Sequence, residues 1–306
     1  MKKEASHPYL IESISDLHRL FALPKPAHPL VSVIDLSDIK CRVDDSIKSV
    51  MYSFYSICIK KDFMGKLKYG QNYYDFDEGI MTFFSPGQVI STDTPDNIAV
   101  SGWWLVVHPD FLLNHVLARG IKDYGFFSYA VNEALHLSDK EEAMIKSIMM
   151  NIAQEYHAAI DSFSQDVMLS HIDLLLNYSN RFYNRQFITR KHVSNDLLTR
   201  LEMILSDYFN SDKVQEMGLP TVQYISEQLS ISPTYLSDML RSLTGQSAQQ
   251  HIHNKLIEKA KEILTTTSLS VSEIAYRLGF EYPQSFSKLF KSKTSVSPLE
   301  FKHSFN

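Results

Sequence analysis

Two hydrophobic patterns divide the chain near residue 110. Before it, short runs rich in β-branched and aromatic residues are separated by Gly, Pro, Asn and Asp. Along 52–60, successive residues point to opposite faces, and both faces are partly apolar, which is typical of a strand between two packed layers. The pattern predicts short antiparallel strands in a small barrel or sandwich. The runs are 31–36, 49–60, 65–70, 73–84 and 99–107.

After residue 110 the apolar spacing becomes helical. A capping box at Ser138 and Glu141 starts one helix that ends near residue 159, and a second helix is predicted over 164–187. Three apolar residues on the second helix lie seven apart, which fits either packing on its own domain or a dimer interface. They are Met168, Leu175 and Phe182. A linker is predicted at 186–195.

The last 110 residues contain an internal repeat. Residues 221–248 match 270–298, first at an offset of 49 and then, past Gly279, at an offset of 50. The second copy therefore has one extra residue in its turn. Each copy predicts two helices joined by a tight turn, and a helix over 248–265 connects the copies.

Local chemistry supports a turn in both copies. In the second copy, Ser270 and Glu273 form a capping box, and Gly279 suits the left-handed position that ends a helix. Phe280 can then fold back onto that helix, and Pro283 can occupy the first position of the next one. In the first copy, Ser232 followed by proline is a helix start of the same kind.

Two helices joined by a short turn, with a polar outer face on the second, make a helix-turn-helix arrangement. There the second helix enters the major groove of DNA, where Gln can pair with adenine and Lys with guanine. Any helical hairpin could give one such copy, but two linked copies favour DNA binding. The outward residues are Thr234, Ser237, Asp238 and Arg241 in the first copy, and Gln284, Ser287, Lys288 and Lys291 in the second.

Charge qualifies this interpretation. The chain has a formal net charge of −5, and residues 194–306 hold 11 Lys and Arg against 12 Asp and Glu. The C-terminal part is therefore not a general polyanion binder. Four lysines gather near the end of the chain against Glu300 alone, so we expect DNA binding that is sensitive to salt, with a shallow dependence. They are Lys288, Lys291, Lys293 and Lys302.

Residues 258–264 and 269–301 resemble the signature of the AraC/XylS family of transcription regulators, and the likeness extends over about 196–306. The resemblance implies two helix-turn-helix units that bind double-stranded DNA and contact RNA polymerase, and it adds Pro283 to the candidate base readers. Ser295 stands where the family usually has Gly, so a strained or reshaped turn is expected there. Lys302 replaces an Arg, and Leu256 stands where many members carry Arg. The acidic Asp238 would repel phosphate.

The N-terminal part resembles, more loosely, the cupin-like sensor domains of such regulators, best over 73–91. This likeness implies a small-molecule effector in a barrel and a homodimer formed through the following helices. Core packing and ligand stacking both fit the aromatic residues of the strands. The candidate ligand residues are Tyr55, Tyr73, Phe83 and Trp103.

The expected fold class is therefore α+β: a cupin-like barrel or sandwich with helices over 1–190, then an all-α DNA-binding domain over 191–306. Within the second domain, 221–245 and 270–295 are the two helix-turn-helix units. We expect a cytoplasmic transcription regulator, with activation as its expected mode, that has no cofactor or metal and no membrane partner. The sequence leaves open the operator, the choice between activation and repression, and the existence of an effector.

Two other functional classes fit the sequence less well. A metal-dependent cupin enzyme needs several His and carboxylate ligands, but the strands carry only His108. The one His-x-His, at His251 and His253, falls on the connecting helix, where such residues lie on different sides. The other rival is a protein whose helix-turn-helix units bind protein partners. Only two cysteines, Cys41 and Cys58, and no signal-peptide pattern fit a reducing compartment.

Overall fold

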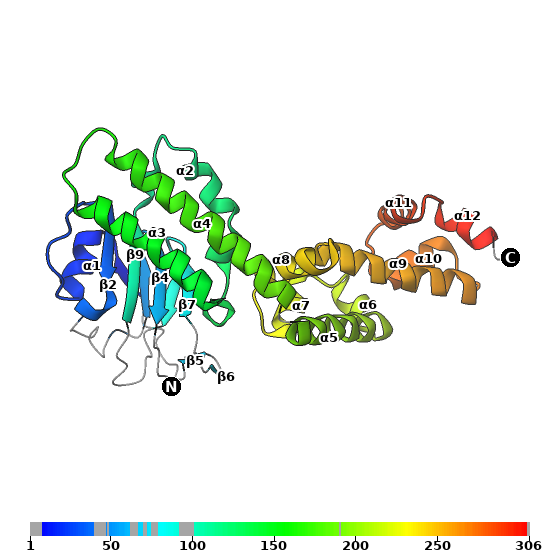
Figure 1. The fold of residues 1–306 in the computed structure, drawn as a ribbon. Helices are drawn as coiled ribbons and strands as arrows, with labels where there is room; N and C mark the ends of the chain where they lie inside the picture. Colours follow the sequence, from blue (N-terminus) through cyan, green and yellow to red (C-terminus); the bar gives the residue numbers. More distant parts are fainter. Residues whose placement is uncertain are drawn as a thin grey trace. The chain divides into compact units, whose positions relative to one another are not determined.

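The computed structural model describes residues 8–39, 47, 49–61, 67–69, 72–74, 79–91, 101–189 and 191–304 (Figure 1). The fold is α+β and divides into two compact units, Met1–Gln186 and Phe187–Asn306. The division falls inside helix α4 (Ser164–Thr189), and α5 (Lys191–Asn210) begins two residues after α4 ends. The segment predicted as a linker is therefore mostly helical, because it contains neither Pro nor Gly. No helix in the described ranges is long and apolar enough to cross a membrane.

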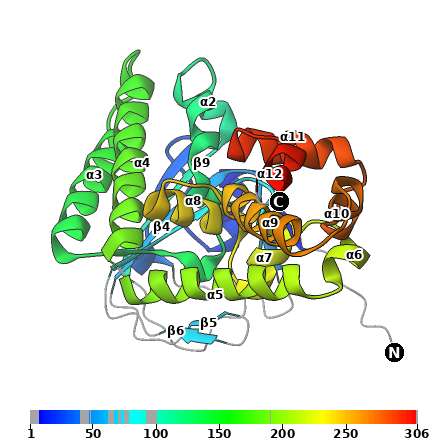
Figure 2. The same ribbon diagram turned by 90° about the vertical axis from the view of Figure 1, so that its right-hand side faces the viewer.

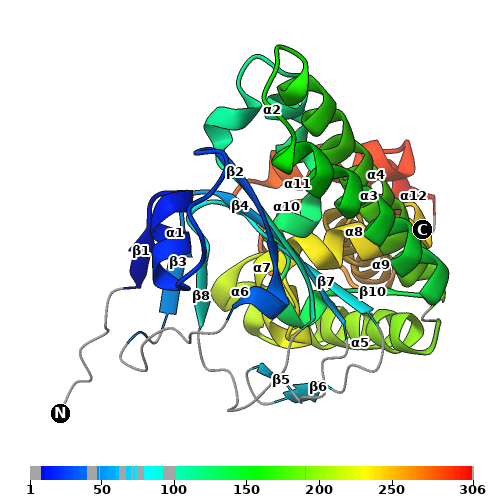
Figure 3. The ribbon, with the colours of Figure 1, turned by 60° about the vertical axis from the view of Figure 1, so that its left-hand side comes forward.

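Antiparallel pairing builds the main sheet of the N-terminal unit, in the order β10-β7-β4-β9-β2 (Figure 3). A second sheet has the order β1-β3-β8, and β5 pairs with β6. The strands are β1 (Tyr9–Ile11), β2 (Val31–Asp35), β3 (Ser49–Tyr52), β4 (Tyr55–Lys61), β5 (Leu67–Tyr69), β6 (Asn72–Tyr74), β7 (Gly79–Phe84), β8 (Val89–Ser91), β9 (Ser101–Val107) and β10 (Leu135–Leu137).

The run predicted over 49–60 forms two strands rather than one. The chain bends at Ser53 and Phe54, so that β3 joins the three-stranded sheet and β4 the five-stranded sheet. Buried residues from both sheets and from α1 (Ile14–Leu20) then form one apolar cluster, which includes Phe54 and Trp104. The Trp104 indole N–H donates to the Ser56 hydroxyl at 2.7 Å, which satisfies the polar edge of the ring.

Helices α3 (Asp139–His157) and α4 belong to the same unit as the five-stranded sheet, and α3 packs on β2. Met168, Leu175 and Phe182 of α4 are all buried, at 5%, 0% and 5% exposure. Of the two alternatives for these residues, packing in their own unit is therefore the one observed. The capping box of Ser138 and Glu141 at the start of α3 is confirmed.

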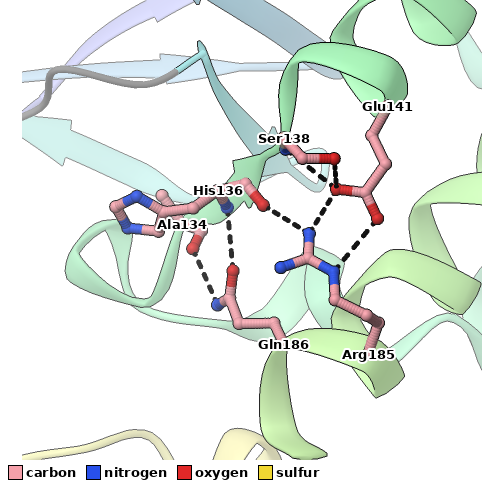
Figure 4. Close-up of polar contacts among 6 residues, drawn as sticks. All are labelled: Ala134, His136, Ser138, Glu141, Arg185 and Gln186. Carbon is pink, nitrogen blue, oxygen red and sulfur yellow. Dashed lines mark hydrogen bonds and ion pairs between the residues drawn. The ribbon is translucent and has the colours of Figure 1, made fainter. Parts of the chain in front are cut away.

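Side chains near the C-terminal end of α4 complete the open edge of β10 (Figure 4). The Gln186 amide group accepts from the His136 backbone N–H at 2.8 Å and donates to the Ala134 carbonyl at 3.2 Å. Arg185 donates to the His136 carbonyl at 2.7 Å and pairs with Glu141 at 2.5 Å. The edge strand is thereby bonded by side chains of α4 in place of another strand.

Eight helices account for most of the C-terminal unit as described. They are α5, α6 (Lys213–Met217), α7 (Val222–Leu229), α8 (Pro233–Thr244), α9 (Ala248–Thr266), α10 (Val271–Arg277), α11 (Pro283–Thr294) and α12 (Pro298–His303). Helix α9 contacts both pairs, α7–α8 through α8 and α10–α11 through both helices, while α5 packs beside α7 and α9 (Figure 2). The shorter helices of the N-terminal unit are α2 (Leu117–Gly120) and the 3-10 turns η1 (Leu36–Asp38), η2 (Pro109–Leu112), η3 (Ile121–Asp123), η4 (Gly125–Ser128) and η5 (Val131–Glu133).

Candidate nucleic-acid interface

The turn inside each helix pair has the same hydrogen bonds in both copies. At the end of α10, Gly279 donates to Tyr276 and Phe280 donates to Ala275, both at 3.0 Å. At the end of α7, Ser230 donates to Glu227 and Ile231 donates to Ser226, both at 3.1 Å. All four residues lie 49 positions before their counterparts in the second copy. This is the Schellman pattern, and it places Ser230 and Gly279 in the left-handed region, with φ of 59° and 80°.

The extra residue of the second copy is located by the helix starts. The N-cap of α8 is Ser232 and that of α11 is Tyr282, which are 50 positions apart, whereas the turns before them are 49 apart. Glu281 is therefore the inserted residue. Proline follows the N-cap in both copies, as predicted.

The second helix of each pair also ends in the same way. Gly245 donates to Arg241 at 3.0 Å and Ser295 donates to Lys291 at 2.8 Å, again 50 positions apart. Ser295 has a φ of 67° against 72° for Gly245. The turn at Ser295 therefore keeps the shape that glycine gives, and the serine takes a left-handed conformation that costs an L-residue about 1–2 kcal/mol.

Helix α11 has one buried face and one exposed polar face. Phe286 and Phe290 are fully buried, whereas Gln284, Lys288 and Lys291 are exposed. Spacing of three and four residues puts the exposed side chains in one stripe along the helix. Of the other predicted base readers in this copy, Pro283 and Ser287 are half-buried.

Helix α8 carries a less basic outer face. Arg241 is exposed, but its guanidinium donates to the Asp238 carboxylate at 3.1 Å, so the two charges offset each other. Thr234 and Ser237 are half-buried. Between them, Tyr235 makes an edge contact with Phe187, with ring centroids 5.1 Å apart.

Two further residues of the second copy are exposed at the start of α11 and are not among the predicted base readers. Ser285 is exposed next to Gln284 on α11, and Tyr282, just before Pro283, is 58% exposed. Ser285 lies three residues before Lys288, so the same spacing of three and four residues includes it. Tyr282 also provides no side-chain hydrogen bond to cap α11, whereas the Ser232 hydroxyl accepts from the Tyr235 N–H at 3.2 Å on α8.

The two histidines of α9 make separate contacts. His251 bonds to the Thr244 hydroxyl and His253 to the Gln249 amide, each at 2.9 Å. Burial lowers the pKa of both imidazoles, and Lys293 lowers the pKa of His253 further. Across the described ranges, no three His, Cys, Asp or Glu side chains are grouped as ligands for a metal ion.

The candidate ligand residues of the N-terminal unit lie in or near packed layers. Tyr55 and Phe83 are buried on one face of the main sheet. The ring of Phe127 makes edge contacts with both, with ring centroids 5.1 Å from Tyr55 and 5.7 Å from Phe83. Trp103 shares that face and is half-buried. The cavity beside Phe83 has a volume of about 10 Å³, room for about one water molecule. The side chain of Tyr73 lies outside the described residues.

Comparison with known proteins also identifies a helix-turn-helix domain in the C-terminal unit. A family model described as "Helix-turn-helix domain" matches residues 225–304. The solved C-terminal domain of the two-component response regulator yesN from Fusobacterium nucleatum is 30% identical, over 93% of that chain and 33% of this one, with a TM-score of 0.29. Residues 225–304 form an AraC-type helix-turn-helix domain.

Two curated relatives are named as HTH-type transcriptional regulators. HTH-type transcriptional regulator YfiF of Bacillus subtilis is 30% identical over 161 residues, 51% of this chain and 48% of the relative. HTH-type transcriptional activator RhaS of Escherichia coli is 30% identical over 139 residues, 45% of each chain. The chain thus spans about half the length of these relatives. Both relatives are named as HTH-type transcriptional regulators, and the matched family model describes a helix-turn-helix domain.

Proposed function

We propose that this protein is a transcription regulator that binds double-stranded DNA in a sequence-specific way. The observation that carries the proposal is the exposed stripe of Gln284, Lys288 and Lys291 on α11, held outward because Phe286 and Phe290 are buried behind it. An amide next to a cation suits the reading of base edges in the major groove, together with contact to phosphate.

A second helix pair supports the proposal. Helix α9 has 19 residues and therefore a length of about 28 Å, so α8 and α11 can occupy successive major-groove segments. The rival function, recognition of a protein partner by the two pairs, has no such reason for a repeat with matched turns.

The test begins with selection of DNA duplexes from a random library by the full-length chain. On the selected duplex, Gln284→Ala should relax discrimination at one base pair, by about 1–3 kcal/mol. Lys291→Ala should weaken binding to every sequence alike and lower the salt slope by about 1, because it removes one phosphate contact. Fluorescence anisotropy at several salt concentrations measures both effects.

A variant of the first copy should increase DNA affinity, whereas Lys291→Ala should decrease it. Asp238→Asn removes the partner that offsets Arg241, so it should strengthen binding and steepen the salt slope. A wild-type chain that selects no DNA sequence contradicts the proposal, and uniform losses in both second-copy variants contradict the assigned roles of Gln284 and Lys291.

Control of this binding by a small-molecule effector in the N-terminal unit is part of the proposal, as are contact with RNA polymerase, homodimer formation and a cytoplasmic location. The family likeness motivates each of them. A thermal-shift screen against metabolites tests the effector, since a bound ligand raises the unfolding temperature by mass action. No stabilising compound in a broad screen would count against it.

A further inference from the structure

A backbone contact joins the second helix-turn-helix pair to the segment just before the first. A Cβ atom added to Gly279 would lie 2.9 Å from the Val214 carbonyl oxygen and 3.0 and 3.1 Å from two backbone atoms of Gly218. Real Cβ atoms almost never come so close to another atom. The turn of α10–α11 is therefore packed, backbone on backbone, against the end of α6.

Gly218 is held in place from the other side. Its φ of 77° and ψ of −154° lie in a region that only glycine visits readily. The Tyr208 hydroxyl of α5 donates to the Gly218 carbonyl at 3.1 Å. The ordinary pKa of tyrosine already keeps this hydroxyl protonated near neutral pH, and burial raises the pKa of Tyr208 further.

Tyr208 also connects this point to the first helix pair. Its ring makes an edge contact with Tyr224 of α7 at 5.1 Å, and the Lys213 ammonium group donates to the Tyr224 hydroxyl at 3.3 Å. Gly218 itself lies only three residues before Thr221, the N-cap of α7. The end of α6 is therefore tied both to α7 and to the turn of the second pair.

Without this tie, α9 would be the main connection between the two pairs. One helix fixes their distance but leaves their relative rotation less restrained. The contact of α6 with α10 adds a second, separate connection (Figure 2). Two separate points of contact restrain the rotation of the pairs as well as the distance between them.

We propose that the contact between Gly218 and Gly279 is a positioning contact that sets the separation and rotation of the two DNA-reading helices. It would thereby determine the spacing between the two half-sites of the DNA. This inference rests on the proposed function. Gly218 and Gly279 touch no DNA themselves and act through the placement of α8 and α11.

The chain provides a matched pair of variants for the test. Gly279→Ala introduces both a strained left-handed alanine and the clash with Val214 and Gly218. Gly245→Ala introduces the same kind of strain, at φ 72°, but its added methyl group meets no atom within 4 Å. The difference between the two variants therefore isolates the contact.

The experiment is selection of duplexes by full-length wild type and by both variants, with about 30 randomised base pairs, roughly three turns of DNA. Wild type and Gly245→Ala should select two half-sites at one common separation. Gly279→Ala should select the same half-site sequences with an altered or broadened separation. Its affinity for the wild-type spacing should fall on the order of tenfold below that of Gly245→Ala.

Hydrogen exchange in the absence of DNA tests the contact directly. Gly279→Ala should raise exchange in segments 208–218 and 275–283, whereas Gly245→Ala should not. If Gly279→Ala fails to fold, Tyr208→Phe replaces it, because that change removes only the bond to the Gly218 carbonyl. Tyr208→Phe should change the selected half-site spacing in the same direction as Gly279→Ala, but by a smaller amount.

The outcomes separate this inference from the proposed function. A wild type that selects no sequence overturns the proposed function, and the spacing role with it. A wild type that selects two half-sites, together with a folded Gly279→Ala that keeps their separation, overturns the spacing role alone. Unchanged exchange in 208–218 and 275–283 for Gly279→Ala also overturns it.

Discussion

The first helix-turn-helix pair presents Asp238 and Arg241 on its outer face, where the second pair presents Lys288 and Lys291 at the equivalent positions. In the first pair the two charges bond to each other at 3.1 Å. In the second pair both charges are positive and exposed. Backbones with the same hydrogen bonds thus carry different electrostatics, and most of the attraction for phosphate is expected from the second pair.

The left-handed residues are exchanged between the pairs. The first pair has serine at its inner turn and glycine after its second helix, and the second pair has the reverse order. Ser230 is exposed, whereas Gly279 is crowded by α6. The comparison teaches that hydrogen bonding fixes the conformation of such a residue, while neighbouring atoms decide whether a side chain is allowed there.

The largest expected effect comes from emptying the core of one pair. Phe286 and Leu236 are equivalent and fully buried. Phe286→Ala should lower the free energy of unfolding by about 3–5 kcal/mol and Leu236→Ala by about 2–5 kcal/mol, because each leaves a cavity. Denaturant unfolding measures the loss, and hydrogen exchange should locate it in the altered pair. Exposed Ser285→Ala is the control, with an expected change within about 0.5 kcal/mol. A loss below about 1 kcal/mol for Phe286→Ala would contradict a packed core there.

A smaller effect is expected from exchanging the residues that end α8 and α11. Ser295→Gly should raise the free energy of unfolding by about 0.5–1 kcal/mol, because relief of left-handed strain exceeds the entropy cost of glycine. Gly245→Ser should lower it by about the same amount. Thermal unfolding of the two variants beside wild type checks the signs. Changes of the same sign in both would show that the two turns are not equivalent.

The smallest effect concerns acid. Hydrogen bonds from the Ser270 side chain and backbone lower the pKa of Glu273 from its ordinary 4.5, and those from the Ser297 backbone and side chain lower the pKa of Glu300. A lowered pKa in the folded state gives stability that is complete above pH 4.5 and lost as pH falls through the folded-state value. At the equivalent places the first copy has Tyr224 and Gln250, so neither position carries a carboxylate.

Acid should therefore loosen the second pair before the first. Hydrogen exchange of α10 and α12 should rise earlier than that of α7 and α9 as pH is lowered from 7 to about 3. In a Glu273→Gln, Glu300→Gln double variant this difference should largely disappear. An acid response identical in the double variant and in wild type would argue against the two capping boxes as its source.

Local signals in the sequence were enough to predict most of the helices and turns of the C-terminal unit. The capping box at Ser270, the cap at Ser232 and the two turn bonds made by Gly279 and Phe280 all join atoms three to five residues apart. Interactions of that range depend on little besides the sequence itself, so the helix starts, the turns and the repeat could be predicted. The same holds for the exposed stripe on α11, which follows from helical spacing.

Long-range packing decided the rest. The split of 49–60 between two sheets and the burial of Met168, Leu175 and Phe182 depend on partners far along the chain. So do the packed surroundings of Tyr55 and Phe83. Gly279 combines a locally determined feature with one that depends on tertiary packing. Its sequence context determined that it ends a helix in a left-handed turn, but only the tertiary structure brought Gly218 against it, because that contact joins residues 61 positions apart.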